Sequence, residues 1–223
     1  VAEGRKAVAL AQISNRLLFV AHVLRFWPES VAAHDQVLKQ HLGKALGAST
    51  YRLSAFPEWG TWFADRSQSG GAILDLQIHD IDFVNWCLGR PTKVFSQRID
   101  HPRSAADEVH TVLTYPGAKA EVVASYLLPD SYPFTAGFRI AFENGAIEYG
   151  MRSAGVELFA DQVGHALTSF PSGGIAAPLD APGEDPYAAE LRHVIDCVRT
   201  REASGVISAK AGLEALEVCE ASA

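Results

Sequence analysis

A run of short strand-like segments between residues 92 and 170 restricts the fold more than any other feature of the sequence. The dipeptides Pro116-Gly117 and Asn144-Gly145 each separate two such segments, and Asn-Gly between apolar runs favours a tight hairpin turn. Successive hairpins build an antiparallel sheet, so we predict such a sheet here. The predicted strands cover residues 92–100, 108–115, 119–127, 137–143, 146–150 and 155–160.

Helical patterns lie on both sides of this run. A continuous set of strands that helices precede and follow is typical of the α+β class. We therefore predict an open, mainly antiparallel sheet with helices packed on one face. The predicted helices cover residues 2–16, 29–42, 72–88, 185–199 and 209–221, and a further strand covers residues 45–54.

The apolar run over residues 17–24 has a different character. Near-continuous apolar runs are typical of a strand that is buried on both faces of a parallel sheet. Together with the helix before it, this strand would form the last unit of a doubly wound domain. The sequence starts at Val1, without an initiator Met and inside a predicted helix, so we expect a truncated chain.

Composition excludes several classes of function. The net charge is −7 at pH 7 and the pI is about 5.6, which disfavours binding to nucleic acid. The longest apolar runs are shorter than the roughly 20 residues that cross a bilayer, and the N-terminus does not have the pattern of a signal peptide. Cys87, Cys197 and Cys219 lie far apart, so we expect reduced thiols in a cytoplasmic protein.

The predicted helix over residues 72–88 carries a stripe of titratable groups. At about 100° per residue, Asp75, His79 and Asp82 fall within about 60° of one another. Because burying them unpaired would be costly, they either pair or face a cleft. In a cleft, His79 could act as a general acid/base that Asp75 orients. A plain surface pair and a metal site remain alternatives, although helix spacing alone gives a metal thin support.

Two further groups of residues are candidates for ligand binding. His22 and Arg25 lie at the end of the predicted buried strand, where ligands of parallel sheets bind. Trp59 and Trp62 lie in an aromatic loop and could line a sugar-like ligand. The alternatives are a buried structural histidine and arginine, and aromatic rings that only hold the loop in place.

Several of these motifs together resemble one family. Gly70-Gly71 followed by Asp75-x-x-x-His79-x-x-Asp82 is similar to the substrate-domain motif of the Gfo/Idh/MocA oxidoreductases, which are named for glucose–fructose oxidoreductase and inositol dehydrogenase. Other segments resemble the same family in the same order along the chain: residues 22–28, 134–139, 143–149 and 185–200.

The resemblance implies a dehydrogenase with two domains and a nicotinamide cofactor, NAD or NADP. Residues 1–27 would be a remnant of its Rossmann domain. Residues 28–223 would form the C-terminal domain that binds a sugar, cyclitol or related polyol and builds homodimers or homotetramers through the sheet. The resemblance makes His79 and Asp75 catalytic, and it places other residues at the substrate (Arg25, Asp82, Trp59 and Trp62) and at the cofactor (Arg25 and His22).

The sequence departs from this family in one respect. It contains no G-x-G-x-x-G loop and no Glu-Lys-Pro motif, whose lysine polarises the reacting oxygen in the family. We therefore expect the 223-residue chain by itself to bind no cofactor and to turn over no substrate. A non-catalytic sugar-binding or oligomerisation module derived from the same fold remains the alternative.

Overall fold

A computed structural model describes residues 1–102, 104–153 and 162–223. Its centre is an eight-stranded sheet in the order β2-β3-β4-β1-β5-β6-β7-β8. Only β1 and β4 pair in parallel, and the other neighbours pair antiparallel. The strands are β1 (Ala45–Ala55), β2 (Lys93–Asp100), β3 (Asp107–Tyr115), β4 (Ala118–Leu128), β5 (Thr135–Phe142), β6 (Gly145–Ser153), β7 (Gln162–Pro171) and β8 (Ala177–Pro178).

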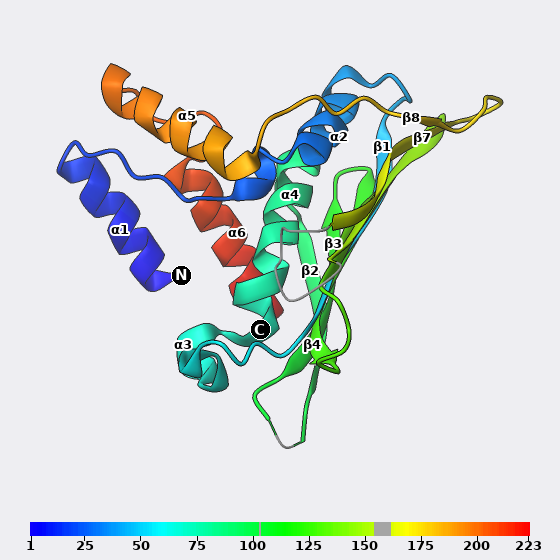
Figure 1. Cartoon of the computed structure of the whole chain (residues 1–223). Coiled ribbons are helices and arrows are strands. Elements are labelled where there is room, and N and C mark those ends of the chain that lie inside the picture. Colours follow the sequence, from blue (N-terminus) through cyan, green and yellow to red (C-terminus); the bar gives the residue numbers. More distant parts are fainter. Residues whose placement is uncertain (103, 154–161) are drawn as a thin grey trace.

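The helices lie on one face of this sheet (Figure 1). The predicted α+β class, with an open and mainly antiparallel sheet, is therefore confirmed. The α-helices are α1 (Ala2–Ile13), α2 (Pro28–Lys39), α3 (Arg66–Ser69), α4 (Ile78–Leu88), α5 (Pro186–Thr200) and α6 (Ala209–Ser222). Short 3-10 helices span Val23–Arg25 (η1) and Thr61–Ala64 (η2), and a π-helix spans Ile73–Gln77 (η3).

The predicted strands differ from the structure in two places, and one predicted strand is not tested. Segment 155–160 lies outside the described residues, whereas β7 follows it in a region where we predict no strand. β1 lies in the middle of the sheet, because the chain leaves it through α3, η3 and α4 and returns at the far edge as β2. That crossover makes the β1–β4 pair parallel, which a series of hairpins would not predict.

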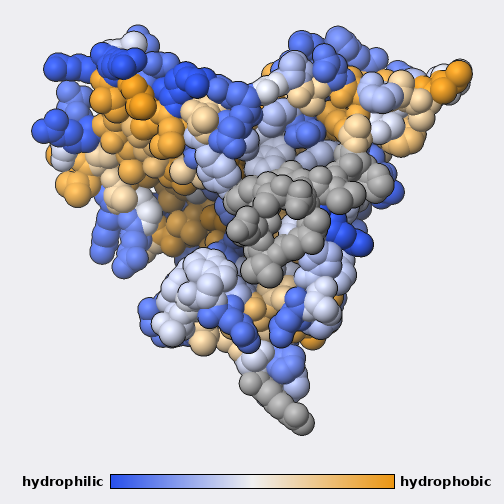
Figure 2. All heavy atoms as spheres, viewed as in Figure 1, coloured by the Kyte–Doolittle hydropathy of each residue, from blue (hydrophilic) through white to orange (hydrophobic). Residues whose placement is uncertain are grey.

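The N-terminal segment also differs from the prediction. Residues 17–24 form no strand of a sheet, since Phe19 makes a single isolated bridge to Ser208 and the 3-10 helix η1 begins at Val23. A buried parallel strand needs neighbouring strands for its backbone groups, and none of the described strands lies beside this segment. On α1, Leu10 and Ile13 are exposed, and Figure 2 shows an apolar area between α1 and α5.

The core fills the space between α4 and the sheet. Inward-facing strand residues such as Val109, Val122 and Ile140 are fully buried, and the rings of Phe83 on α4 and Phe138 on β5 lie 4.9 Å apart. The buried Gln77 joins the π-helix to the sheet. Its amide nitrogen donates to two strand carbonyls, at 3.1 and 2.9 Å, and its oxygen accepts from a threonine hydroxyl. This amide is therefore fully satisfied.

Gly71 allows the chain to enter the helix that carries His79. Its φ is 65°, in the region that favours glycine. The buried Asp107 carboxylate lies directly against Gly71, and its Oδ1 accepts a hydrogen bond from the Ala72 N–H at 2.9 Å. A Cβ at position 71 would lie 2.7 Å from Asp107 Oδ2. Glycine at position 71 is thus required by this close approach.

Gly71→Ala should therefore lower the free energy of unfolding by about 3 kcal/mol, because it combines a positive φ with displacement of a carboxylate that caps a helix. Gly117→Ala is the matched control, because Gly117 has φ 83° with no atom within 4 Å of an added Cβ. It should cost about 1–2 kcal/mol. Urea denaturation of both variants checks this, and equal losses would contradict the role of Asp107.

Candidate functional site

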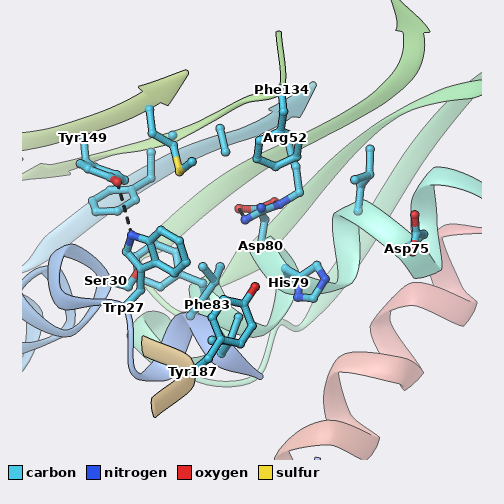
Figure 3. Close-up of a pocket in the computed structure, with 17 residues that line it drawn as sticks. Trp27, Ser30, Arg52, Asp75, His79, Asp80, Phe83, Phe134, Tyr149 and Tyr187 are labelled. Carbon is cyan, nitrogen blue, oxygen red and sulfur yellow. Dashed lines mark hydrogen bonds and ion pairs between the residues drawn. The ribbon is translucent and has the colours of Figure 1, made fainter. Parts of the chain in front are cut away.

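A cavity of about 210 Å³ lies between α4 and the strands β1, β5 and β6. Figure 3 shows its two sides, with the helix that carries His79 and Asp80 facing Arg52, Phe134 and Tyr149 of the sheet side. The residues that line it are Val23, Leu24, Trp27, Ser30, Arg52, Asp75, Leu76, His79, Asp80, Phe83, Phe134, Ala136, Gly137, Phe138, Tyr149, Met151 and Tyr187.

His79 lies in the wall of this cavity, as the sequence predicts for a residue that faces a cleft. Burial lowers the pKa of its imidazole to about 3, and the nearby positive charge of Arg52 acts in the same direction. The ring is therefore neutral near pH 7. A neutral imidazole has one nitrogen that donates a hydrogen bond and one that accepts, so it can receive a proton from a bound hydroxyl group.

Asp75 lines the same cavity but does not orient His79. Its carboxylate accepts a hydrogen bond from the Tyr126 hydroxyl, and among the described residues no hydrogen bond or ion pair joins it to His79. Figure 3 shows the two side chains at different places along the cavity. Asp75 lies in the π-helix, whose wide turn rotates the chain less per residue than an α-helix does. Burial raises the pKa of Asp75.

Asp82, the third residue of the predicted stripe, is sealed in the core. It is 1% exposed and does not line the cavity. Arg25 holds it with two hydrogen bonds, Nε to Oδ2 at 2.8 Å and Nη2 to Oδ1 at 2.9 Å. The structure therefore places Asp82 away from the cavity, and its predicted contact with a substrate stays a prediction.

Arg25 and His22 belong to the same buried network. Arg25 also donates from Nη1 to the Val206 carbonyl at 2.8 Å, and His22 Nε2 lies 3.7 Å from Asp82 Oδ1. Burial lowers the pKa of His22. Neither residue lines the cavity, and their predicted contact with a substrate or cofactor stays a prediction.

Trp59 and Trp62 lie outside the cavity as well. Both pack on Phe63, with ring centroids 4.6 and 3.9 Å apart, and Trp59 is 78% exposed. Their aromatic contacts hold the loop around η2 in place, which is the alternative that the sequence left open. The predicted contact with substrate therefore does not match the cavity found here.

The pair Arg52–Asp80 is the main charged feature that the sequence reasoning missed. Arg52 Nε donates to Asp80 Oδ2 at 2.9 Å, and its guanidinium lies 5.7 Å from the centre of the Phe134 ring. Burial raises the pKa of Asp80, and Arg52 opposes that effect. The two residues lie on different elements, so no local motif indicates that they pair.

Four aromatic residues of the cavity wall were also not predicted from the sequence: Phe138, Tyr149, Trp27 and Tyr187. Phe138 and Tyr149 are inward residues of β5 and β6, and the alternation of buried and exposed residues along these strands could have identified them. Trp27 and Tyr187 each border a helix that begins with proline, α2 and α5. Only the folded chain brings these four residues to one cavity.

The described residues provide no metal site. Among them, no group of three or more His, Cys, Asp or Glu side chains could hold an ion, so the three-residue metal site that the helix spacing left open is not supported. A search of the same residues also finds no helix with the length and apolar character that crossing a bilayer requires.

The structure is an α+β domain in which helices cover one face of an open sheet. A cavity lies between the two layers, and a histidine lies in its wall. The model of the GFO/IDH/MocA C-terminal domain matches residues 30–148, which is more than half of the chain. The chain therefore belongs to the GFO/IDH/MocA family of oxidoreductases, as the motifs indicated.

Relatives of known name fit this assignment. Trans-1,2-dihydrobenzene-1,2-diol dehydrogenase from Mus musculus is 30% identical over 121 residues, which is 52% of this chain and 35% of that protein. The Homo sapiens enzyme of the same name is 31% identical over the same shares. The aligned part thus spans about a third of these relatives.

Solved structures share the fold over nearly the whole chain. The aldose–aldose oxidoreductase from Caulobacter crescentus has a TM-score of 0.79 at 20% identity, covering 99% of this chain and 64% of that one. The UDP-N-acetylglucosamine 3-dehydrogenase from Acidithiobacillus ferrooxidans has a TM-score of 0.75 at 19% identity, covering 99% and 65%. At these identities the likeness establishes the fold alone.

The lowered pKa of His79 predicts a dependence of stability on pH. The unfolded imidazole has its ordinary pKa of 6.5 and the folded one about 3, so between these values the unfolded chain binds more protons and stability falls as pH falls. Between pH 7 and pH 5, the free energy of unfolding of the wild-type chain should fall by about 2 kcal/mol more than that of the His79→Gln variant. Urea denaturation at both pH values measures it, and parallel losses in both proteins would contradict the buried imidazole.

Proposed function

We propose that this chain supplies the polyol-binding part of an NAD- or NADP-dependent oxidoreductase. One observation carries the proposal: a neutral imidazole, that of His79, lies in the wall of a ring-sized cavity. Membership of an oxidoreductase family and the dehydrogenase names of the relatives support the same reaction class. The substrate would be a small sugar, cyclitol or related polyol.

His79 would receive the proton of the reacting hydroxyl. A pKa of about 3 makes the imidazole a weak base, but it also guarantees the unprotonated form at neutral pH. The nicotinamide, when bound, would supply the acceptor for the hydride that leaves a C–H bond of the alcohol. As that hydride leaves, the attached oxygen approaches a protonated carbonyl, which is a strong acid. Even a weakly basic ring at hydrogen-bond distance then accepts the proton.

Asp75 would contact a second hydroxyl of the same substrate. Its carboxylate lines the cavity and has a hydrogen bond from the Tyr126 hydroxyl, which leaves acceptor capacity on a group that has two oxygens. This role replaces the orientation of His79, because the two side chains do not touch. Burial keeps the pKa of Asp75 above its usual range, so this contact would weaken where the carboxyl is protonated.

The cofactor would be held elsewhere. The 223 residues contain no glycine-rich loop to hold a pyrophosphate, and the buried Arg25 is paired with Asp82. We therefore assign residues 28–223 to the substrate domain and residues 1–27 to a remnant of a Rossmann domain. The free, buried cysteines suit the reducing cytoplasm.

Substitution of His79 tests the proposal directly. His79→Gln should weaken the binding of trans-cyclohexane-1,2-diol or myo-inositol to this chain about tenfold, the equivalent of one lost hydrogen bond. His41→Gln is the matched control, because His41 is exposed and does not line the cavity. Isothermal titration calorimetry measures both, and unchanged affinity in His79→Gln would refute the role of the imidazole.

The cofactor assignment has its own test. Titration of NADH or NADPH with the 223-residue chain, followed by nicotinamide fluorescence, should give no saturable change, since the chain has no cradle for the phosphates. A saturable increase in nicotinamide fluorescence would show that the 223-residue chain binds the cofactor. It would refute our proposal that residues outside this sequence hold it.

The uncovered face of the sheet would join copies of the chain. Phe95 and Ile99 on β2 are 62% and 56% exposed, and Val112, the cross-strand neighbour of Phe95 on β3, is 38% exposed. Phe170 on β7 is 42% exposed, and the strand register puts it on the same face. Exposed apolar groups on one sheet face favour an interface between subunits, which supports the homodimer or homotetramer that the resemblance implies.

Phe95→Glu should shift the chain toward monomer, because it would bury a carboxylate in that interface. Trp59→Glu is the control, because Trp59 is an exposed aromatic residue outside the sheet. Sedimentation velocity measures the species present. A wild-type chain that is already monomeric, or an assembly that Phe95→Glu leaves intact, would contradict an interface on the sheet.

A further inference from the structure

Arg52 places a charged group on the inner face of the sheet. It follows the buried Ala48 and Thr50 at alternate positions of β1, so its side chain points toward the helical layer. This side chain is 12% exposed, and it lines the cavity. Because burying a charge is costly unless hydrogen-bond partners satisfy it, the partners of this guanidinium bear on what the cavity binds.

Asp80 satisfies only one edge of the guanidinium. Arg52 Nε donates to Asp80 Oδ2 at 2.9 Å, and Nη2 donates to Oδ1 at 3.4 Å. The guanidinium has further N–H groups on Nη1 and Nη2, and among the residues that the structure describes no acceptor is bonded to them. The edge that Nη1 and Nη2 form is therefore free. Such an edge is a planar fork that matches the two oxygens of a carboxylate.

Two contacts hold the guanidinium in place before any ligand binds. The centre of the Phe134 ring lies 5.7 Å from its central carbon, and the Asp80 carboxylate that it binds is buried. A fork that is fixed in this way loses little conformational freedom on binding. Figure 3 shows Arg52 on the sheet side of the cavity and His79 on the helical side, so the two groups face the same space.

The positive charge of Arg52 acts on other groups of the wall. It adds to burial in lowering the pKa of His79, and it opposes the burial that raises the pKa of Tyr187. Asp75 is the other acidic side chain besides Asp80 among the described residues of the wall. Burial raises the pKa of Asp75, so it is more readily neutralised than an exposed carboxyl when an anion binds nearby.

We propose that Arg52 binds a carboxylate of the substrate, so that the cavity takes a sugar acid in preference to the neutral sugar. The inference rests on the proposed function, and it names the substrate class of the same site. The substrate carboxylate accepts hydrogen bonds from Nη1 and Nη2 of Arg52, while a hydroxyl of the ring contacts His79. Asp80 is a positioning residue, because it acts on the substrate only through Arg52.

Three ligands with the same sugar ring test this inference: D-glucuronate, its neutral amide D-glucuronamide, and D-glucose. Isothermal titration calorimetry with the 223-residue chain measures their affinities. D-glucuronate should bind about tenfold more tightly than either neutral ligand, which is the equivalent of one charge-assisted hydrogen bond.

Substitutions of the ion pair separate the charge of Arg52 from its fork. Arg52→Lys keeps the charge but not the fork, so it should lower the affinity for D-glucuronate about fivefold. The double variant Arg52→Gln with Asp80→Asn leaves neither charge buried without its partner, and it should bind D-glucuronate and D-glucuronamide equally. Arg16→Gln is the matched control, because Arg16 is exposed and does not line the cavity. Circular dichroism verifies that each variant is folded.

Several results would overturn the inference: equal affinities of the wild-type chain for D-glucuronate and D-glucuronamide, a preference for D-glucuronate that persists in the folded double variant, or no binding of any of the three ligands. The result for His79→Gln separates this inference from the proposed function. Equal affinities that both fall in His79→Gln reject the carboxylate and keep the polyol site. A preference for D-glucuronate that depends on Arg52 but not on His79 keeps the role of Arg52 and rejects the proton acceptor.

Discussion

The buried ion pair between Arg25 and Asp82 is the interaction on which the arrangement of the helices depends. Arg25 uses Nε and Nη2 on the carboxylate and Nη1 on the Val206 carbonyl. Its guanidinium also lies 5.4 Å from the centre of the Trp86 ring, which stacks on His34 of α2 at 3.8 Å. One side chain thus joins η1, α2, α4 and the segment before α6. Removing one partner of such a pair typically costs 3–5 kcal/mol, because the other charge remains buried.

The cavity follows from this connection. Arg25 holds the segment that contributes Val23, Leu24 and Trp27 to the wall, while Gln77 fixes the other end of the helical layer to β3 and β4. His79 lies between these two attachments. A binding group gains precision when packing and hydrogen bonds behind it fix its orientation. Two of the residues predicted at the site, Arg25 and Asp82, thus hold the helices that carry the cavity wall.

Local patterns in the sequence predicted most of the fold, because alternation and turn residues act over short distances. The Asn144-Gly145 hairpin joins β5 to β6 as expected, and Ser208 caps α6. Such patterns do not predict the parallel pair of β1 and β4, because β1 pairs with its neighbouring strands only after the chain has passed through α4. Residues 17–24 have the composition of a buried strand, but none of the strands that the structure describes lies beside them.

The site was predictable only in part for the same reason. His79 was found, because its residue type and its place on an apolar helix are local facts. The position of Asp75 depends on a π-helix that the spacing of residues does not indicate. Arg52 and Asp80 meet across two layers, and Asp82 pairs with a residue from the other end of the domain. Such pairs are set by tertiary packing.

We propose that the imidazole of His79 touches a bound polyol. Nuclear magnetic resonance of the histidine side chains during titration with trans-cyclohexane-1,2-diol measures this contact most directly. We predict a saturable shift of the resonances of the His79 ring nitrogens, with the resonances of the exposed His41 unchanged. Saturable binding that leaves the His79 resonances in place would contradict it.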